Sequence, residues 1–345
     1  MASVFALLGL AVLIVVHELG HMAVARLAGM RVDRFSIGFG PTLLRWRGRK
    51  TSYQVALIPL GGFVQIAGMN PQEQLPAGDP GSYANKSPAA RFATILAGPL
   101  TNYVCAMLVM IGVALVWGLP HWQRTTVVAE VDKGRPAAAA GFRAGDVVQS
   151  IDAKAVTTTD EVVALITASK GRELRVAVLR GGATQVLRVR PRESDGVYTV
   201  GIMFGQKLAF AALPAGLALE YGATYPFKES QRALGGLKLL FTGKVSVKQV
   251  GGPVEILRQL KISFEESIAM ALVFLAMLNV YLGLFNLMPI PALDGGRLVF
   301  LIFTMVTRRA VNARLENAIH TVGFVLLLGL ILLITYRDLA RILGG

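Results

Sequence analysis

The sequence predicts a polytopic α-helical membrane protein with about four transmembrane helices, a membrane-associated β-hairpin and an inserted α+β domain. Of the 345 residues, 54% are hydrophobic and only 16% are charged, a composition typical of membrane proteins. Apolar runs long enough to cross a bilayer alternate with stretches rich in lysine and arginine. Between residues 126 and 205, short alternating strands and one capped helix indicate a soluble domain instead.

The net charge of +14 would also suit a nucleic-acid-binding protein. The basic residues mostly flank the apolar runs, however, so they favour a role in membrane topology. We therefore expect membrane lipid, and no nucleic acid, among the partners. The single cysteine, Cys105, lies in an apolar run, which excludes an intrachain disulfide.

The first apolar run, residues 4–28, contains His17, Glu18 and His21. It lacks the flanking features of a signal peptide, so we interpret it as a retained transmembrane helix. Positions four apart lie on one helix face, which lets the two imidazoles bind one metal ion. Glu18 is then suited to act as general base for the water that the metal activates. Because ionisable groups inside a membrane span are costly, a functional site is favoured over two core histidines.

A basic loop follows the first span, and by the positive-inside rule we expect it to be cytoplasmic and the N-terminus to lie outside. Its basic residues include Arg31, Arg34, Arg45, Arg47, Arg49 and Lys50. The histidines come late in the span, so the metal site should lie nearer the cytoplasmic face.

Within that loop, residues 52–68 read as two short apolar strands around Gly61 and Gly62, which indicates a β-hairpin. We expect it to dip into the membrane beside the metal-binding helix, although a surface hairpin is the alternative. Its edge near Gly61, Gly62 and Phe63 would suit pairing with an extended substrate segment.

The second span, residues 93–117, completes an N-terminal membrane part of residues 1–125. It contains Gly98, Pro99 and Asn102 among apolar residues. A polar Asn102 turned inward would reach the metal and substrate, or would serve helix packing alone.

Residues 126–205 form the inserted domain. The order of their strand and helix patterns, with AGFRAGDVV at residues 140–148, resembles a circularly permuted bacterial PDZ domain. That resemblance implies binding of extended peptides or C-termini by strand addition, and a size-filter or packing domain that binds no peptide is the alternative. Residues 206–265 are amphipathic and basic, which suits a linker at the outer membrane surface.

The C-terminal membrane part, residues 266–345, opens with a span from Ile268 that Pro289 and Pro291 interrupt. Asp294 follows this break, and we expect it to be the third metal ligand, with a helix N-cap as the alternative. Asn286 could donate hydrogen bonds to an oxyanion or to the substrate backbone. A second basic stretch precedes the last span, residues 319–336, so four crossings place both termini and the inserted domain outside.

The combination of HELGH at residues 17–21, LAGP at 96–99 and NLMPIPALDGG at 286–296 resembles the site-2 proteases, and more narrowly their bacterial RseP-type members. The resemblance implies an inner-membrane zinc protease that cleaves pre-trimmed single-span proteins, such as anti-sigma factors or remnant signal peptides. It makes His17, His21 and Asp294 zinc ligands and Glu18 the base. One PDZ-like domain, where better-known members have two, is a departure. The alternatives are a non-proteolytic scaffold that binds peptides through the PDZ-like domain, and a metal transporter.

Overall fold

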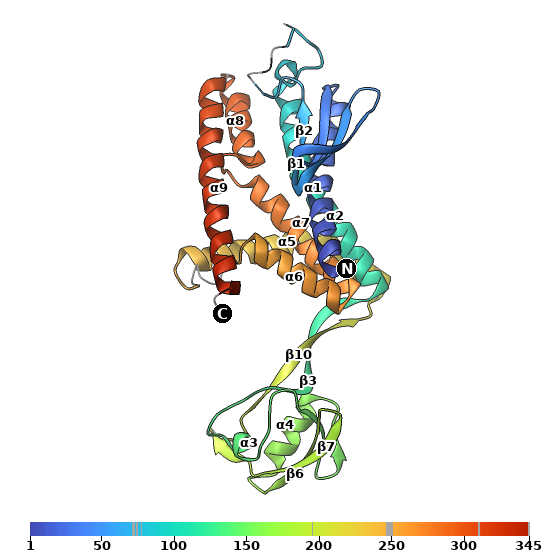
Figure 1. The fold of residues 1–345 in the computed structure, drawn as a ribbon, viewed down its shortest axis with the longest axis vertical. Helices are drawn as coiled ribbons and strands as arrows, with labels where there is room; N and C mark the ends of the chain where they lie inside the picture. The colour runs from blue at the N-terminus through green and yellow to red at the C-terminus, as the bar shows by residue number, and fades with distance from the viewer. Residues whose placement is uncertain are drawn as a thin grey trace. The chain divides into compact units, whose positions relative to one another are not determined.

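The computed structural model describes residues 1–70, 73, 75–76, 78–194, 196–245, 251–309 and 311–343 (Figure 1). The chain forms two compact units, one of Met1–Trp117 with Leu213–Gly345 and the other of Gly118–Ala212. The second unit exceeds the predicted range of 126–205 at both ends. The reason is that its first and last strands continue to pair beyond those limits, as far as Leu119 and Ala211.

Seven helices of more than ten residues build the described part of the first unit. They are α1 (Ala2–Leu27), α2 (Pro88–Val116), α5 (Ala215–Phe241), α6 (Pro253–Glu266), α7 (Ile268–Leu287), α8 (Asp294–Thr307) and α9 (Ala313–Leu343). Four segments among them are long and apolar enough to cross a membrane: Ala2–Leu27, Pro88–Val116, Ile268–Leu287 and Arg314–Arg341.

Helix α2 lies between α1 and α7 and holds them at short distances. A Cβ atom added to Gly20 of α1 would overlap the backbone of Ala97, and one added to Gly283 of α7 would come within 2.9 Å of the carbonyl oxygen of Pro99. Both glycines therefore allow close helix packing rather than an unusual backbone conformation. Helix α2 starts at Pro88, where the Ser87 hydroxyl accepts a hydrogen bond of 3.2 Å from the Ala90 N–H.

The hairpin differs from the prediction. Its strands are β1 (Val32–Arg47) and β2 (Ser52–Ile66), and the direction of β2 along β1 reverses between Val55 and Gly62, since Ile37 pairs with both residues. These glycines also allow close packing: a Cβ at Gly61 would overlap the Phe39 ring, and one at Gly62 would lie 2.8 Å from the Ser36 carbonyl oxygen. The chain thus reverses next to these glycines, but its two arms flank the start of β1 and do not pair with each other.

In β1, the residues from Arg34 to Ile37 have partners at both ends of β2. Phe35, for example, pairs with Val64 and also with Tyr53. The start of β1 therefore lies between the two ends of β2, and the segment 62–66 forms one edge of the sheet.

The region 206–265 contains more structure than a linker. Its first residues belong to the last strand of the second unit, and α5 packs on α2 and α7. The hydroxyl groups of Tyr103 and Ser230 lie 2.6 Å apart, and the Tyr281 hydroxyl donates to the buried Glu229 at 3.1 Å. These hydrogen bonds satisfy polar groups that burial would otherwise leave unpaired.

The second unit contains a sheet of order β10-β3-β4-β6-β7, with β5 paired to β4 and a separate pair β8-β9. The strands are β3 (Leu119–Val131), β4 (Val147–Ile151), β5 (Lys154–Ala155), β6 (Leu174–Arg180), β7 (Ala183–Val189), β8 (Arg192–Ser194), β9 (Val197–Thr199) and β10 (Ile202–Ala211). Helix α3 (Pro136–Ala139) follows β3, and α4 (Thr159–Ala168) starts with a capping box made by Thr158 and Glu161. Apolar residues such as Val128, Val148 and Val178 form the core.

Candidate metal centre

His17 and His21 lie one helical turn apart on the buried face of α1, and both are less than a tenth exposed. Their Nε2 atoms are 3.2 Å apart and the two rings meet edge to face. A Cβ added to Gly98 of α2 would overlap the His21 ring. The glycine of the LAGP element therefore makes room for the His21 imidazole on the neighbouring helix.

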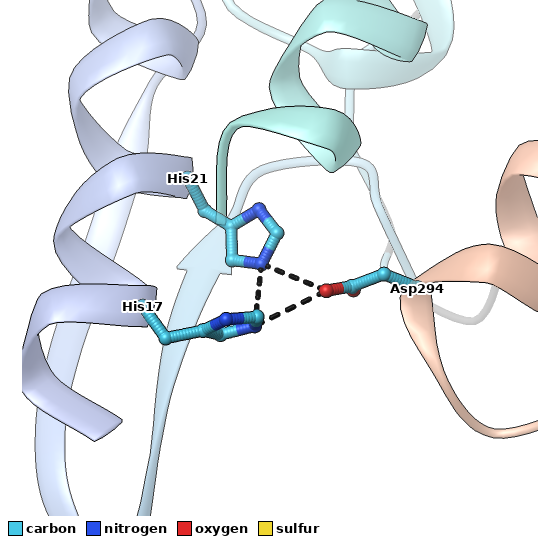
Figure 2. Close-up of side chains that lie close together, drawn as sticks. All are labelled: His17, His21 and Asp294. Carbon is cyan, nitrogen blue, oxygen red and sulfur yellow. Dashed lines mark hydrogen bonds and ion pairs between the residues drawn. The ribbon is translucent and has the colours of Figure 1, made fainter. Parts of the chain in front are cut away.

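Asp294, the first residue of α8, completes the cluster from the other end of the chain (Figure 2). Its Oδ2 atom lies 3.1 Å from His17 Nε2 and 3.3 Å from His21 Nε2. Helix α8 can begin here because Gly295 and Gly296 have no side chain: a Cβ at either position would overlap the backbone between Leu287 and Pro291. The DGG sequence thus folds the end of α7 back against the start of α8.

The free ring nitrogens of the two histidines have partners of their own. His21 Nδ1 donates to the carbonyl oxygen of Thr94 at 2.8 Å, which leaves Nε2 as the ligand atom. The fully buried side-chain amide of Asn102 lies 3.3 Å from His17 Nδ1. Turning this amide over would let its oxygen, which has no other partner, accept the Nδ1 proton. Asn102 therefore orients His17.

The three ligand atoms fit a zinc ion. Two imidazole lone pairs and one carboxylate oxygen converge within 4.8 Å of one another, and Asp294 Oδ2 is buried without a conventional hydrogen bond. Such a group of acceptors repels itself unless a cation lies between its members. Two nitrogens and one oxygen are also the donor set of catalytic zinc sites, which keep a position open for water.

Glu18 lies on the side of α1 that faces β2. A backbone hydrogen bond links Val64 to its carboxylate, and a Cβ at Gly62 would be 3.6 Å from its Cγ. The strand and the carboxylate are therefore in direct contact. A carboxylate beside the ligands, held by a backbone donor, is placed to exchange protons with water at the metal.

Two other residues singled out from the sequence, Phe63 and Asn286, have partners of their own. Phe63 stacks on Phe39, with ring centroids 6.3 Å apart. Asn286, in the last turn of α7, donates to the Leu282 carbonyl oxygen at 2.9 Å. No hydrogen bond in the described part of the chain joins Asn286 to the three ligands.

His320 of α9 is a residue that the sequence reasoning missed. Its Nδ1 accepts a hydrogen bond of 2.9 Å from the Ala292 N–H, and Ala292 has a φ of 76°. A Cβ at Gly323, one turn along, would overlap Pro291. Helix α9 thus supports the loop before Asp294. An ionisable side chain inside an apolar span was the signal that could have identified His320.

The chain combines helices that can cross a membrane with a buried cluster of two histidines and one carboxylate, next to a glutamate. These features define a membrane metallohydrolase. Residues 5–330 match the model of peptidase family M50, and the chain belongs to this family. It is a zinc metalloprotease.

Two bacterial proteins illustrate the similarity. A Clostridium perfringens protein that is named as a zinc metalloprotease is 35% identical to this chain, and the similarity covers 98% of each chain. The zinc metalloprotease RasP of Oceanobacillus iheyensis is 27% identical, with 96% of this chain and 97% of RasP covered. Among solved structures, the PDZ domain of an SdrC-like protein from Listeria monocytogenes covers 23% of this chain and 84% of its own. Its identity of 22% and TM-score of 0.21 are too low to assign a fold.

Proposed function

We propose that this enzyme cleaves peptide bonds within or beside the transmembrane segments of single-span proteins in the bacterial inner membrane. The observation that carries the proposal is the position of the ligands: His17 and His21 lie inside a candidate span, and Asp294 follows another. A hydrolytic centre built there can reach a bond that the bilayer shields from soluble proteases.

The side chains divide the chemistry among them. His17, His21 and Asp294 would hold the zinc ion, and Thr94 and Asn102 orient the two imidazoles. Bound zinc supplies Lewis acidity that activates water and polarises the scissile carbonyl. Glu18 accepts the proton from water and returns it to the leaving nitrogen. Asn286 is proposed to turn from its own helix and donate a hydrogen bond to the substrate.

Strand β2 is proposed to bind the substrate in extended form through Gly61, Gly62 and Phe63. The sheet of the described residues contains only β1 and β2, so the segment 62–66 keeps one edge unpaired. That edge is next to Glu18 through Val64. A transmembrane helix must unwind before its carbonyl groups can be attacked, and pairing with a strand edge offsets the cost of its unsatisfied groups.

The topology and the inserted domain complete the proposal. Both basic loops lie in the cytoplasm by the positive-inside rule, with the metal centre nearer that face and the inserted domain outside. The domain, PDZ-like by its sequence pattern, excludes substrates with bulky ectodomains, so anti-sigma factors and signal peptides are cleaved only after trimming. Deleting residues 118–212 should then permit cleavage of an untrimmed substrate, and continued refusal would count against the filter.

The site of cleavage tests the central proposal. Purified protein in proteoliposomes is incubated with a model single-span substrate, and the products are mapped by mass spectrometry. Cleavage within the apolar segment is expected. Cleavage confined to the water-exposed tails would contradict an intramembrane activity. The scaffold alternative loses its support because the family is a peptidase family.

A further inference from the structure

A basic cavity of about 770 Å³ lies where α1 ends and the hairpin begins. Its volume is within the roughly 300–1,000 Å³ range of small-molecule sites. Four cationic side chains line it: Arg26, Arg31, Arg49 and Lys50. A fifth, Lys86, comes close, because a Cβ added to Gly29 in the cavity wall would lie 3.1 Å from its Nζ.

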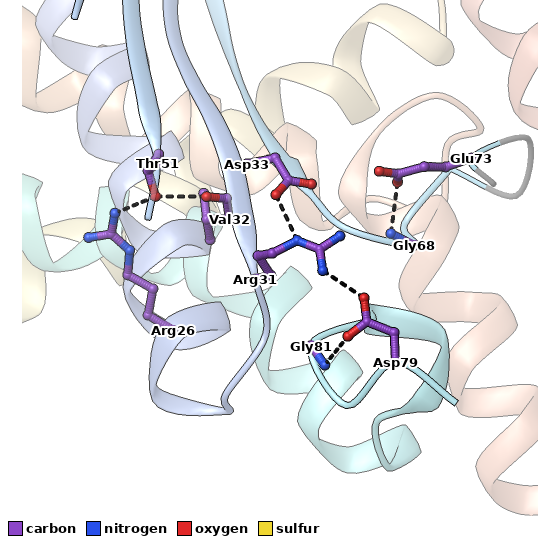
Figure 3. A network of polar contacts seen from close by, with 9 residues as sticks. All are labelled: Arg26, Arg31, Val32, Asp33, Thr51, Gly68, Glu73, Asp79 and Gly81. Carbon is purple, nitrogen blue, oxygen red and sulfur yellow. Dashed lines mark hydrogen bonds and ion pairs between the residues drawn. The ribbon is translucent and has the colours of Figure 1, made fainter. Parts of the chain in front are cut away.

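The acids near this basic cavity neutralise only one of its cations. Asp33 and Asp79 both bind Arg31, at 2.8 Å and 2.6 Å (Figure 3). The Gly81 N–H and then Arg31 hold the pKa of Asp79 below its usual range, so this carboxylate remains charged at neutral pH. The ion pairs therefore account for Arg31 and leave the other cations of the cavity uncompensated.

The remaining cations have no acidic partner among the described residues. Arg26 donates to the hydroxyl groups of Thr51 and Tyr53, both at 2.9 Å, and these are neutral acceptors. The side chains of Arg49 and Lys50 make no hydrogen bond or ion pair with the described part of the chain. An anion entering the cavity would therefore meet three positive charges of its lining, on Arg26, Arg49 and Lys50. None of the three forms an ion pair with an acid of the described residues.

The position of the cavity indicates where such an anion comes from. The candidate span ends at Leu27, and Arg26 lies in its last turn. Basic residues at the end of a span lie at the level of the lipid headgroups. Anionic lipids attract such clusters, and each basic residue contributes about 1 kcal/mol, or about a factor of five in affinity.

We propose that the basic cavity binds a phosphate group, and that its source is the headgroup of an anionic phospholipid. The headgroup would contact Arg49 and Lys50 at the turn between β1 and β2 and Arg26 at the end of α1. The Thr51 hydroxyl, which donates to the Val32 carbonyl oxygen at 2.7 Å and accepts from Arg26, already joins these elements (Figure 3). A bound lipid therefore fastens the hairpin to the helix that carries the metal ligands.

The test uses the full chain and two matched double variants. Retention of phosphatidylglycerol and of phosphatidylcholine is measured by native mass spectrometry for wild type, R49Q/K50Q and R308Q/R309Q. The last pair removes the same charge from the other basic loop. Wild type should prefer phosphatidylglycerol, and R49Q/K50Q should weaken that binding by about 25-fold, a factor of five for each charge. R308Q/R309Q should bind as wild type does.

Two results would overturn the proposal. If R308Q/R309Q loses as much lipid as R49Q/K50Q, the binding reflects total charge and not this cavity. If the detergent-solubilised protein shows no preference for phosphatidylglycerol, yet binds inorganic phosphate in a manner that requires Arg49 and Lys50, the source is free phosphate and the lipid assignment is wrong.

Discussion

The Nδ1 atom of His320 accepts a hydrogen bond of 2.9 Å from the backbone N–H of Ala292, two residues before Asp294 of the candidate metal centre. Ala292 has a φ of 76°, a backbone conformation that is costly for a residue with a side chain. The hydrogen bond from α9 supports that conformation, and Gly323 lets the loop approach the same helix. Helix α9 therefore supports the candidate metal centre without contributing one of its three residues.

Replacing His320 with alanine should lower zinc affinity by about 10-fold, at the lower end of effects for residues that orient metal ligands. Zinc content is measured by mass spectrometry after dialysis against a series of chelator concentrations. His320→Gln, which retains an acceptor, should restore part of the affinity. His121→Ala, in the second unit, is the matched control and should bind zinc as wild type does. Unchanged affinity in His320→Ala would show that the loop holds Asp294 unaided.

Gly98→Ala should disturb zinc binding directly, because its new Cβ would overlap the His21 ring. The ring would have to rotate away from Thr94 and from the other two ligands. Gly112→Ala on the same helix is the matched control, since nothing lies within 4 Å of a Cβ built there. We expect Gly98→Ala to lose at least about 10-fold in zinc affinity and Gly112→Ala to lose none. Equal affinities would mean that the helices separate at little cost.

Gly62→Ala tests whether β2 must remain close to Glu18. The added Cβ would lie 2.8 Å from the Ser36 carbonyl oxygen and 3.3 Å from Ile14, so the strand must shift. Small displacements of a substrate can slow catalysis by up to about 100-fold. Cleavage should fall while zinc content stays at the wild-type level. The exposed Gly235→Ala on α5 serves as control, and undiminished cleavage by Gly62→Ala would argue against substrate pairing with β2.

The second unit should lose stability in acid through Asp146. Two hydrogen bonds from Arg180, at 2.6 Å and 2.7 Å, hold the pKa of this buried carboxylate below its usual range. A carboxyl group with a depressed pKa in the folded state stabilises the fold above its unfolded pKa of about 3.9. That contribution disappears as the pH falls through the folded-state value.

Hydrogen exchange of residues 118–212 in the intact protein measures this effect after correction for the intrinsic pH dependence of exchange. Protection should be constant near neutral pH and should decrease below about pH 4. Asp146→Asn should be less protected at neutral pH and should show a smaller decrease in acid. A wild-type profile in the variant would exclude Asp146 as the cause.

The clustering of His17, His21 and Asp294 could be predicted from the sequence because the patterns that indicate it are local. The spacing of His17 and His21 places both side chains on one helix face. An aspartate at a break in an apolar run is costly unless it has a functional role or a partner. The long apolar runs likewise predicted the candidate spans. These features need no knowledge of tertiary contacts.

Features that depend on tertiary contacts could not be predicted. Gly61 and Gly62 allow close packing against Phe39 and Ser36, and the local sequence pattern does not show which residues approach them. His320 contacts a loop 28 residues earlier in the chain. The packing of α5 depends on Glu229 and Ser230, which find their partners on α7 and α2. Local sequence patterns contain no information about such partners.

The role of Glu18 as general base is tested most directly by comparing wild type with Glu18→Gln in the cleavage of a single-span substrate. Both proteins are purified and adjusted to the same zinc content, so any difference in rate reflects the carboxylate alone. We expect Glu18→Gln to lose activity by about 100-fold or more, since the substitution removes the general base while His17, His21 and Asp294 retain the metal. Cleavage by Glu18→Gln at the wild-type rate would contradict it.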